Sequence, residues 1–540
     1  MRGKKEIVIL DKEAKKYDLN DLYKALKVRD LEILKNFNNT EISDNDYFFY
    51  GINSDIVSNA LSVVINLLSR NKESAGIDAS CRTIIEAMVI LKMDADGAIS
   101  DNQKKIYRYL YAYVDDSNFH YKANMPDELK EKAPMEEFYK DKEKAKQAII
   151  AHFKCAQNDL RQNNIGIDDP CFYLKQNLND NIRFAKLLEK YPIGNEKDLR
   201  LYEFFSLFIH PRCEMSLEME ESIMEVRDSY IANILDYVFE YLKNCNLLSY
   251  PSDTTDFDTD FYNNPFLRNN IVNISSVNYI LDKTITDFCT MPDGKIDAFT
   301  WQFINRIKYL LIDMMTALSL GYKEHVLSTY RSFVEEYSVY FAINCIDYLT
   351  EFNYIKQGFW VSSRIQLGSH LGNIGIKAKV MSEDKLSELY NKFYKDKYEL
   401  KKEKDFYWDM RNNSLYFLSK EKKSYNKFVK ALFHEVFKIN EAKEKDAMSI
   451  YKMAKDTSHA SGYNFNATED VMALSCHKAM LYTWELLMYY VLNAYLTLQE
   501  HGIDIDVQTS LGVFKDMSQM QVQAIESILK DHYGYNPRKD

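Results

Sequence analysis

Two segments of this chain combine an arginine and a glutamate, four residues apart, within otherwise apolar sequence. They are "SCRTIIEAMVILKM", which contains Arg82 and Glu86, and "STYRSFVEEYSVYF", which contains Arg331 and Glu335. Residues four apart lie on the same face of an α-helix, so each pair can form an ion pair. One interpretation is therefore a partly buried ion pair that fixes the packing of its helix.

A histidine follows each arginine at the same distance. A shift of 249 residues brings the two halves of the chain into partial register and aligns the two Arg-Glu pairs. The same register aligns Tyr202 with Tyr451 and His210 with His459, so each arginine precedes its histidine by 128 residues. Self-similarity at a fixed separation predicts a tandem duplication. The chain would then contain two related helical domains, packed as an internal pseudo-dimer.

Arginine, glutamate and histidine together suit the metal-independent cleavage of RNA. A histidine can accept the proton of a ribose 2′-hydroxyl, whose oxygen then attacks the adjacent phosphorus. An arginine can hold the phosphate through charge-assisted hydrogen bonds, while a glutamate orients a partner or shares the proton transfer. This chemistry requires neither a metal nor a cofactor. The candidate catalytic residues are Arg82, Glu86, His210, Arg331, Glu335 and His459.

The choice of histidine stays open. His120 and His370 follow the arginines of the two pairs by 38 and 39 residues, so they are alternative catalytic candidates. We prefer His210 and His459 because the aligned tyrosines support the same register. For each histidine taken alone, a hydrogen-bonded structural role is the competing interpretation.

The motifs "RTIIE" and "RSFVE", each followed far downstream by a histidine, are similar to a family of bacterial helical domains of unknown function. The set also resembles the catalytic residues of anticodon nucleases in the HEPN superfamily, whose members are helical bundles that often pair to build a ribonuclease site. The usual signature of that superfamily, an arginine separated from a histidine by four to six residues, occurs once, at Arg364 and His370 in "RIQLGSH". The resemblance implies an endoribonuclease that acts on cellular RNA in a bacterial defence or toxin system.

A second feature concerns RNA as a partner. Between Lys392 and Lys430 the chain has twelve basic and six acidic residues, interleaved with aromatic residues. Cationic side chains beside aromatic rings are typical of single-stranded RNA binding. The alternative is a solvated helix with an aromatic stripe facing the core. The candidate RNA-binding residues are Lys395, Lys397, Lys401, Lys402, Trp408 and Arg411.

Composition limits the class of protein. With 16 glycines and 9 prolines in 540 residues, few positions force a helix to stop, which predicts an all-α protein. The net charge of −11 argues against a protein that coats nucleic acid over its whole surface. The eight cysteines form no CxxC pair, so we expect no zinc knuckle or disulfide framework, and a cytoplasmic location. The apolar run Met480–Leu498 contains Glu485, which favours a buried core helix over a membrane segment.

Changes in composition suggest the domain organisation. Prolines and clustered Asp, Thr and Asn mark a linker after residue 250, and β-branched residues beyond it allow at most a short strand or hairpin. We therefore expect a charged lead-in (1–45), a first helical domain (46–250), a linker and mixed segment (251–295), a second helical domain (296–500) and a C-terminal helical tail (501–540).

Three functions stay in competition at this level. The leading hypothesis is a HEPN-like endoribonuclease without a metal. The second is a non-catalytic helical binding or sensor protein, in which the repeated Arg, Glu and His are structural or line a ligand pocket. The third is a scaffold with no site. A second copy of the chain or another protein is open as a partner, and no membrane partner is expected.

Overall fold

The computed structural model describes residues 39, 43–68, 75–101, 103–104, 184–194, 198–207, 217–244, 298–319, 323–345, 425–457, 469–500, 519, 523 and 526. Ten helices have defined bounds, and the described residues contain no β-strand, which confirms the all-α prediction. The linker and mixed segment predicted for residues 251–295, with its short strand or hairpin, lies outside the described residues. So does most of the predicted lead-in and C-terminal tail.

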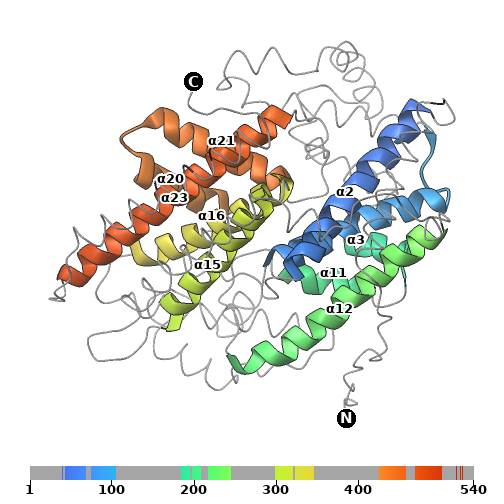
Figure 1. The fold of residues 1–540 in the computed structure, drawn as a ribbon, viewed down its shortest axis with the longest axis horizontal. Helices are drawn as coiled ribbons and strands as arrows, with labels where there is room; N and C mark the ends of the chain where they lie inside the picture. Colours follow the sequence, from blue (N-terminus) through green and yellow to red (C-terminus); the bar gives the residue numbers. More distant parts are fainter. Residues whose placement is uncertain are drawn as a thin grey trace, which may run out of the picture.

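The helices form two groups in Figure 1. The first group belongs to residues 44–244 and the second to residues 298–500. The first comprises α2 (Asp44–Leu68), α3 (Ala75–Ala95), α10 (Phe184–Lys190), α11 (Asp198–Leu207) and α12 (Leu217–Asn244). The second comprises α15 (Ala298–Ser319), α16 (Lys323–Cys345), α20 (Tyr425–Phe437), α21 (Glu441–Thr457) and α23 (Glu469–Glu500).

One helix is central to each group. In the first half, α3 packs along α2 and also contacts α10, α11 and α12. In the second half, α16 packs along α15 and contacts α20, α21 and α23. The two groups meet where α3 contacts α15 and α16. The central helices are the two that carry the Arg-Glu pairs, so these pairs lie where most of the packing converges.

Local sequence signals set several helix ends. The Ser43 hydroxyl accepts a hydrogen bond from the backbone N–H of Asp46 at 3.2 Å and so caps the start of α2. Gly97, two residues beyond the end of α3, has a φ of 70°, a left-handed conformation that favours glycine. The N–H of Ala98 donates a hydrogen bond to the carbonyl of Met93 at 2.9 Å. The N–H of Gly97 donates to the carbonyl of Asp94 at 2.8 Å. This is the Schellman arrangement that terminates a helix.

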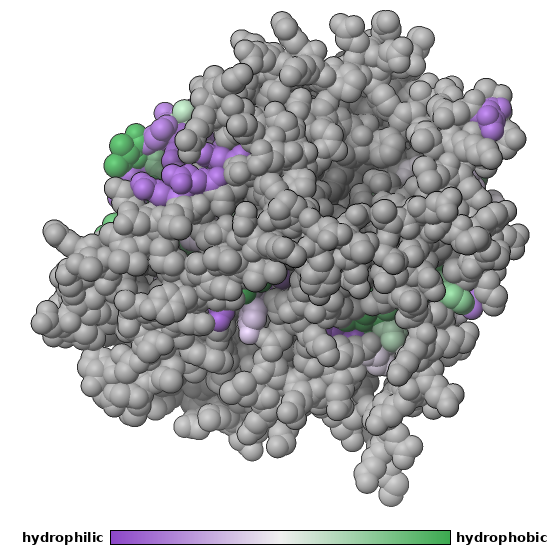
Figure 2. Space-filling model, in the orientation of Figure 1, coloured by the Kyte–Doolittle hydropathy of each residue, from purple (hydrophilic) through white to green (hydrophobic). Residues whose placement is uncertain are grey.

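The central helices owe their stability to apolar burial. On α3, Ile85, Ala87 and Val89 are fully buried, and on α16 Phe333 and Val334 are fully buried. Burial of one such large side chain contributes about 1.5–3 kcal/mol relative to exposure. The hydrophilic side chains visible in Figure 2 gather instead over α20 and α21, at the outer side of the second group.

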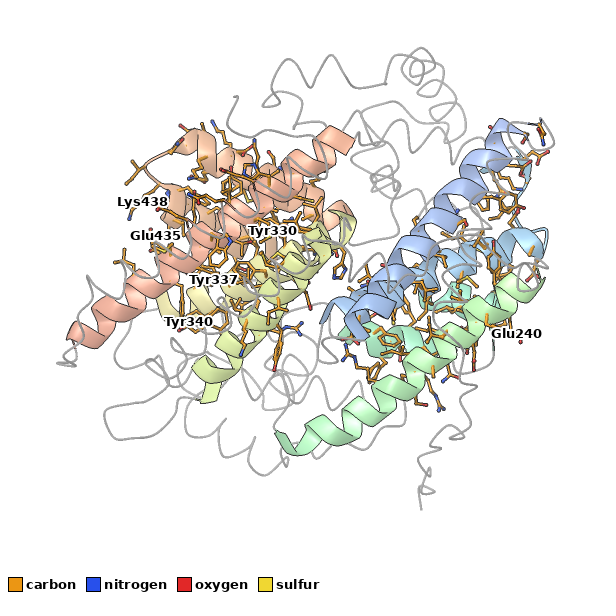
Figure 3. The ribbon with its side chains drawn as sticks, viewed as in Figure 1. Glu240, Tyr330, Tyr337, Tyr340, Glu435 and Lys438 are labelled. Carbon is orange, nitrogen blue, oxygen red and sulfur yellow. The ribbon has the colours of Figure 1, made fainter. Side chains whose placement is uncertain are left out.

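Aromatic rings join α16 to its two long neighbours. The ring of Tyr340 stacks on Phe303 of α15 with centroids 3.8 Å apart, and it meets Tyr490 of α23 edge to face at 5.5 Å. Tyr337, one turn earlier on α16, also meets Tyr490, at 6.2 Å. Figure 3 shows Tyr330, Tyr337 and Tyr340 following one another along α16. Helix α23 is thus a packed helix of the second half, and no described helix is long and apolar enough to cross a membrane.

Candidate functional site

In the first half, the Arg-Glu pair gains a third member from α11. Arg82 Nε donates to Glu86 Oε1 at 3.1 Å along α3. The Tyr202 hydroxyl of α11 donates to the same Glu86 oxygen at 3.3 Å and accepts from Arg82 Nη2 at 3.3 Å. The three side chains therefore close a ring of hydrogen bonds that joins α3 to α11. We call Arg82, Glu86 and Tyr202 the first-half cluster.

The first-half cluster retains a little exposure to solvent. The side chains of Arg82 and Glu86 are 12% and 9% exposed. Burial alone would lower the pKa of the Arg82 guanidinium, but Glu86 and Tyr202 together raise this pKa above its ordinary value. The guanidinium carbon also lies 5.3 Å from the centre of the Tyr202 ring. Arg82 is therefore a permanent cation at the edge of the core.

In the second half, the two hydrogen bonds to the glutamate recur in a drier place. Arg331 Nε donates to Glu335 Oε1 at 2.9 Å along α16, and the Tyr451 hydroxyl of α21 donates to that oxygen at 3.0 Å. The side chains of Arg331 and Glu335 are 6% and 2% exposed, and Tyr451 is fully buried. We call Arg331, Glu335 and Tyr451 the second-half cluster.

The two clusters follow the register found in the sequence. In each, the tyrosine and the glutamate are 116 residues apart. A shift of 249 residues carries α3 onto residues 324–344, within one residue of the bounds of α16 at each end. The same shift carries α11 into α21, and most of α12 onto α23. The helices that hold the two clusters therefore occur in the same order along the chain.

The structure thus joins Arg to Glu in both halves, as the four-residue spacing predicts, and adds a tyrosine that the catalytic hypothesis did not include. The signal for it was present in the sequence, since Tyr202 and Tyr451 align in the common register. The preferred histidines, His210 and His459, lie outside the described residues, three residues beyond α11 and two beyond α21. The alternative candidates, His120, Arg364 and His370, also lie outside them.

The candidate RNA-binding residues, Lys395, Lys397, Lys401, Lys402, Trp408 and Arg411, lie outside the described residues as well. Only the last part of that basic segment is described, as the start of α20. There Lys427 and Lys430 are exposed, whereas Phe428 and Val429 are buried. In this part the lysines face solvent and the aromatic residue faces the core, which is the arrangement of a solvated amphipathic helix.

Other polar groups are also buried. Lys104 Nζ lies 2.7 Å from Asp46 Oδ1 and 2.9 Å from Asp94 Oδ1, and the Tyr50 hydroxyl donates to Asp94. This network ties the start of α2 to the end of α3. The pKa of Tyr50 rises to about 12 because the group is partly buried and bonded to Asp94. Within the described ranges, no three His, Cys, Asp or Glu side chains gather as metal ligands would.

Chemically, the clusters are better suited to holding helices than to turning over a substrate. Each glutamate already accepts hydrogen bonds from both of its neighbours through one oxygen. A phosphate would have to displace these bonds to reach either guanidinium, and at the second-half cluster it would also have to enter the core. The Arg-Glu-Tyr geometry could bind an anion only at the first-half cluster, where some surface remains.

Comparison of this chain with protein-family models, with curated proteins and with solved structures gives no match.

Proposed function

We propose that the protein is a non-catalytic helical binding or sensor protein built from two related halves, each held together by its Arg-Glu-Tyr cluster. The observation that carries the proposal is the recurrence of the cluster at one sequence register, with each arginine already engaged by its glutamate. In both halves the arginine and glutamate lie on the central helix, and the tyrosine comes from a helix far along the chain.

A buried charge is stable only if it is paired and hydrogen-bonded. The tyrosine supplies the second bond to the glutamate, so it favours one orientation of α11 against α3 and of α21 against α16. A cluster of this kind specifies how helices meet, because a rotated helix would leave the carboxylate without its partner. Two halves locked in this way form a rigid framework for a binding surface.

The test compares stability with activity for the same substitutions. Arg331→Ala and Tyr451→Phe are expected to lower the melting temperature, because they leave a buried carboxylate short of partners. Wild-type protein incubated with total RNA in excess chelator is expected to leave the RNA intact. Chelator-resistant cleavage that is lost in Arg82→Ala, with an unchanged melting temperature, would overturn the proposal.

A second candidate is the HEPN-like endoribonuclease of a bacterial defence or toxin system, confined to the first-half cluster. It is favoured by the greater exposure of that cluster, where the side chain of Arg82 is 12% exposed against 6% for Arg331. Arg82 would hold the scissile phosphate, Glu86 would orient the arginine, and His210 would take the 2′-hydroxyl proton. The second-half cluster would then be structural.

This candidate has a matched pair of variants. Cleavage of total RNA should disappear in Arg82→Ala and persist in Arg331→Ala, provided that both proteins remain folded by circular dichroism. His210→Ala should abolish cleavage without changing the melting temperature. Equal activity of the Arg82 and Arg331 variants would exclude a site at the first-half cluster.

A further inference from the structure

The first turn of α3 is bonded to both halves of the molecule. The backbone N–H of Gly76 donates to Asp313 Oδ2 of α15 at 3.3 Å, across the contact between the halves. Two residues later, Asp78 accepts from Arg227 of α12 through both carboxylate oxygens, at 2.8 and 3.0 Å. We call Gly76, Asp78, Arg227 and Asp313 the joint.

The charged members of the joint lie in the core. Asp313 is fully buried, and Asp78 and Arg227 are almost so. The two parallel hydrogen bonds between Asp78 and Arg227 form only when the carboxylate lies in line with the guanidinium. Water does not readily replace a bond that is lost at this depth. The position of the α3 backbone at Asp78 therefore decides how firmly Arg227 is held.

Asp313 stabilises that backbone. The first N–H groups of a helix have no partner within the helix, so its first turn frays unless another group accepts them. Helix α3 begins at Ala75, which places Gly76 among these groups. The carboxylate of Asp313 accepts this hydrogen bond, and its charge complements the positive end of the helix dipole. Because Asp78 lies in the same turn, Asp313 also keeps Asp78 in place.

Helix α12 packs on α3 and α11 beside the joint. Helix α3 lies between α2 and α12 in Figure 1 and contacts both, and it also contacts α15 and α16 of the second half. Tyr230, three residues after Arg227 on α12, meets Phe204 of α11 edge to face with ring centroids 5.0 Å apart. Arg227 therefore lies at the packed part of α12.

The second half has no equivalent of the joint. In the 249-residue register, the positions that correspond to the two carboxylates and the arginine are Leu327, Val64 and Cys476. All three of these side chains are buried and none is charged. The polar groups of the joint are therefore specific to the place where the second half contacts α3.

We propose that the joint couples the two halves, so that a change in the second half that moves Asp313 loosens α12 in the first. Coupling of this kind is a free energy shared by two contacts, and it is measured as the dependence of one contact on the other. A sensor needs one part of the molecule to respond to another. The joint therefore deepens the proposed binding or sensor function and rests on it.

The experiment compares amide hydrogen exchange, followed by mass spectrometry on the full chain, in wild type and in Asp313→Ala. Loss of a helix cap should speed exchange in the first turn of α3 about fivefold. The coupling predicts a similar acceleration in peptides of α12 that contain Arg227. Asp313→Asn, which retains an acceptor oxygen, should accelerate both segments less. Acceleration in α3 with no change in α12 overturns the joint.

The matched control is Tyr451→Phe, which removes one buried hydrogen bond from the second half and lies outside the joint. It should speed exchange in α21 and α16 but leave α12 within about twofold of wild type. If Tyr451→Phe and Asp313→Ala accelerate α12 equally, α12 opens with the whole molecule and the joint is overturned.

A second background isolates the ion pair. In Asp78→Leu/Arg227→Met, the further change Asp313→Ala should still speed exchange in the first turn of α3. It should leave α12 within about twofold of the background variant. Acceleration of α12 that persists there overturns the route through Asp78. Intact RNA with an unresponsive α12 refutes the joint alone, whereas RNA cleavage that requires Arg82 refutes the proposed function whatever the exchange shows.

Discussion

In both halves of the molecule the glutamate of the cluster accepts hydrogen bonds from the arginine and from the tyrosine, but the surroundings of the two clusters differ. In the first half, a second buried ion pair joins the central helix to α12, since Arg227 binds Asp78 through two hydrogen bonds of 2.8 and 3.0 Å. The positions 249 residues later are Leu327 and Cys476, both fully buried and apolar. The contact that recurs is thus the cluster, while its buried neighbour can be ionic or apolar.

This difference indicates what each polar pair contributes. The equivalents of Asp78 and Arg227 in the second half are apolar, so apolar side chains can fill the same kind of helix interface and could replace this ion pair. The Arg-Glu-Tyr cluster, in contrast, occurs in both halves, although one copy is more exposed to solvent than the other. The largest loss of stability is therefore expected when one member of this ion pair is removed and the other remains buried.

The largest effect is expected for Asp78→Ala. The side chains of Asp78 and Arg227 are 5% and 4% exposed, so the variant removes the carboxylate that pairs with a buried guanidinium. A loss of about 3–5 kcal/mol in the free energy of unfolding is expected. Chemical denaturation followed by circular dichroism measures it.

The double variant Asp78→Leu/Arg227→Met is the sharper experiment. It copies the apolar character of the second half, and it should recover most of the stability that Asp78→Ala loses. If the double variant is as unstable as the single one, the ion pair has a role that the apolar counterpart cannot supply.

The next effect compares the two glutamates. Glu335→Ala leaves Arg331 buried beside Tyr451 and should lower stability by about 3 kcal/mol. Glu86→Ala should lower it by about 1 kcal/mol, because Arg82 reaches some solvent and still donates to the Tyr202 hydroxyl. Hydrogen exchange of peptides from α16 and α3 locates each loss. Equal losses in the two halves would show that the difference in exposure has no energetic consequence.

Acid should act mainly on the second half. Burial lowers the pKa of His325 to about 4, and burial with Lys478 nearby lowers that of His477 to about 4 in spite of Glu526. The described residues of the first half contain no histidine. Between pH 6.5 and 4 the unfolded chain binds more protons than the folded chain. The contribution of each histidine to stability is therefore complete above pH 6.5 and is lost as the pH falls through this window. At pH 5 the contribution of each histidine to the free energy of unfolding is about 2 kcal/mol smaller than at pH 7.

Thermal melting at pH 7 and pH 5 measures this dependence. The variant His325→Gln/His477→Gln should melt at a lower temperature at pH 7, but with a smaller difference between the two pH values than wild type. An unchanged difference would mean that carboxylates, and not these histidines, set the acid sensitivity.

The sequence could predict what depends on local periodicity and on repetition. Composition predicts the helical character, and the four-residue spacing predicts the contact between Arg82 and Glu86. The 249-residue register predicts that Tyr202 and Tyr451 occupy equivalent positions in the two halves. The tyrosines were markers of that register, and their hydroxyls turned out to complete the clusters. Nothing local relates Asp78 to Arg227, which are 149 residues apart, because their contact depends on how α12 crosses α3.

The smallest effect concerns another contact of this long-range kind, between the two halves. The backbone N–H of Gly76, in the first turn of α3, donates to Asp313 Oδ2 of α15 at 3.3 Å, and Asp313 is fully buried. A carboxylate at a helix N-terminus binds free N–H groups and complements the partial positive charge there. The position 249 residues before Asp313 is Val64, so the first half offers no equivalent carboxylate.

Asp313→Ala should therefore cost about 1 kcal/mol, seen as faster hydrogen exchange in the first turn of α3. Asp313→Asn, which retains an acceptor oxygen but no charge, should lose less. If exchange accelerates in α15 alone, the carboxylate serves its own helix and does not couple the halves. If it accelerates at the start of α3, one half of the molecule caps the central helix of the other, and the asymmetry between the halves extends to their contact.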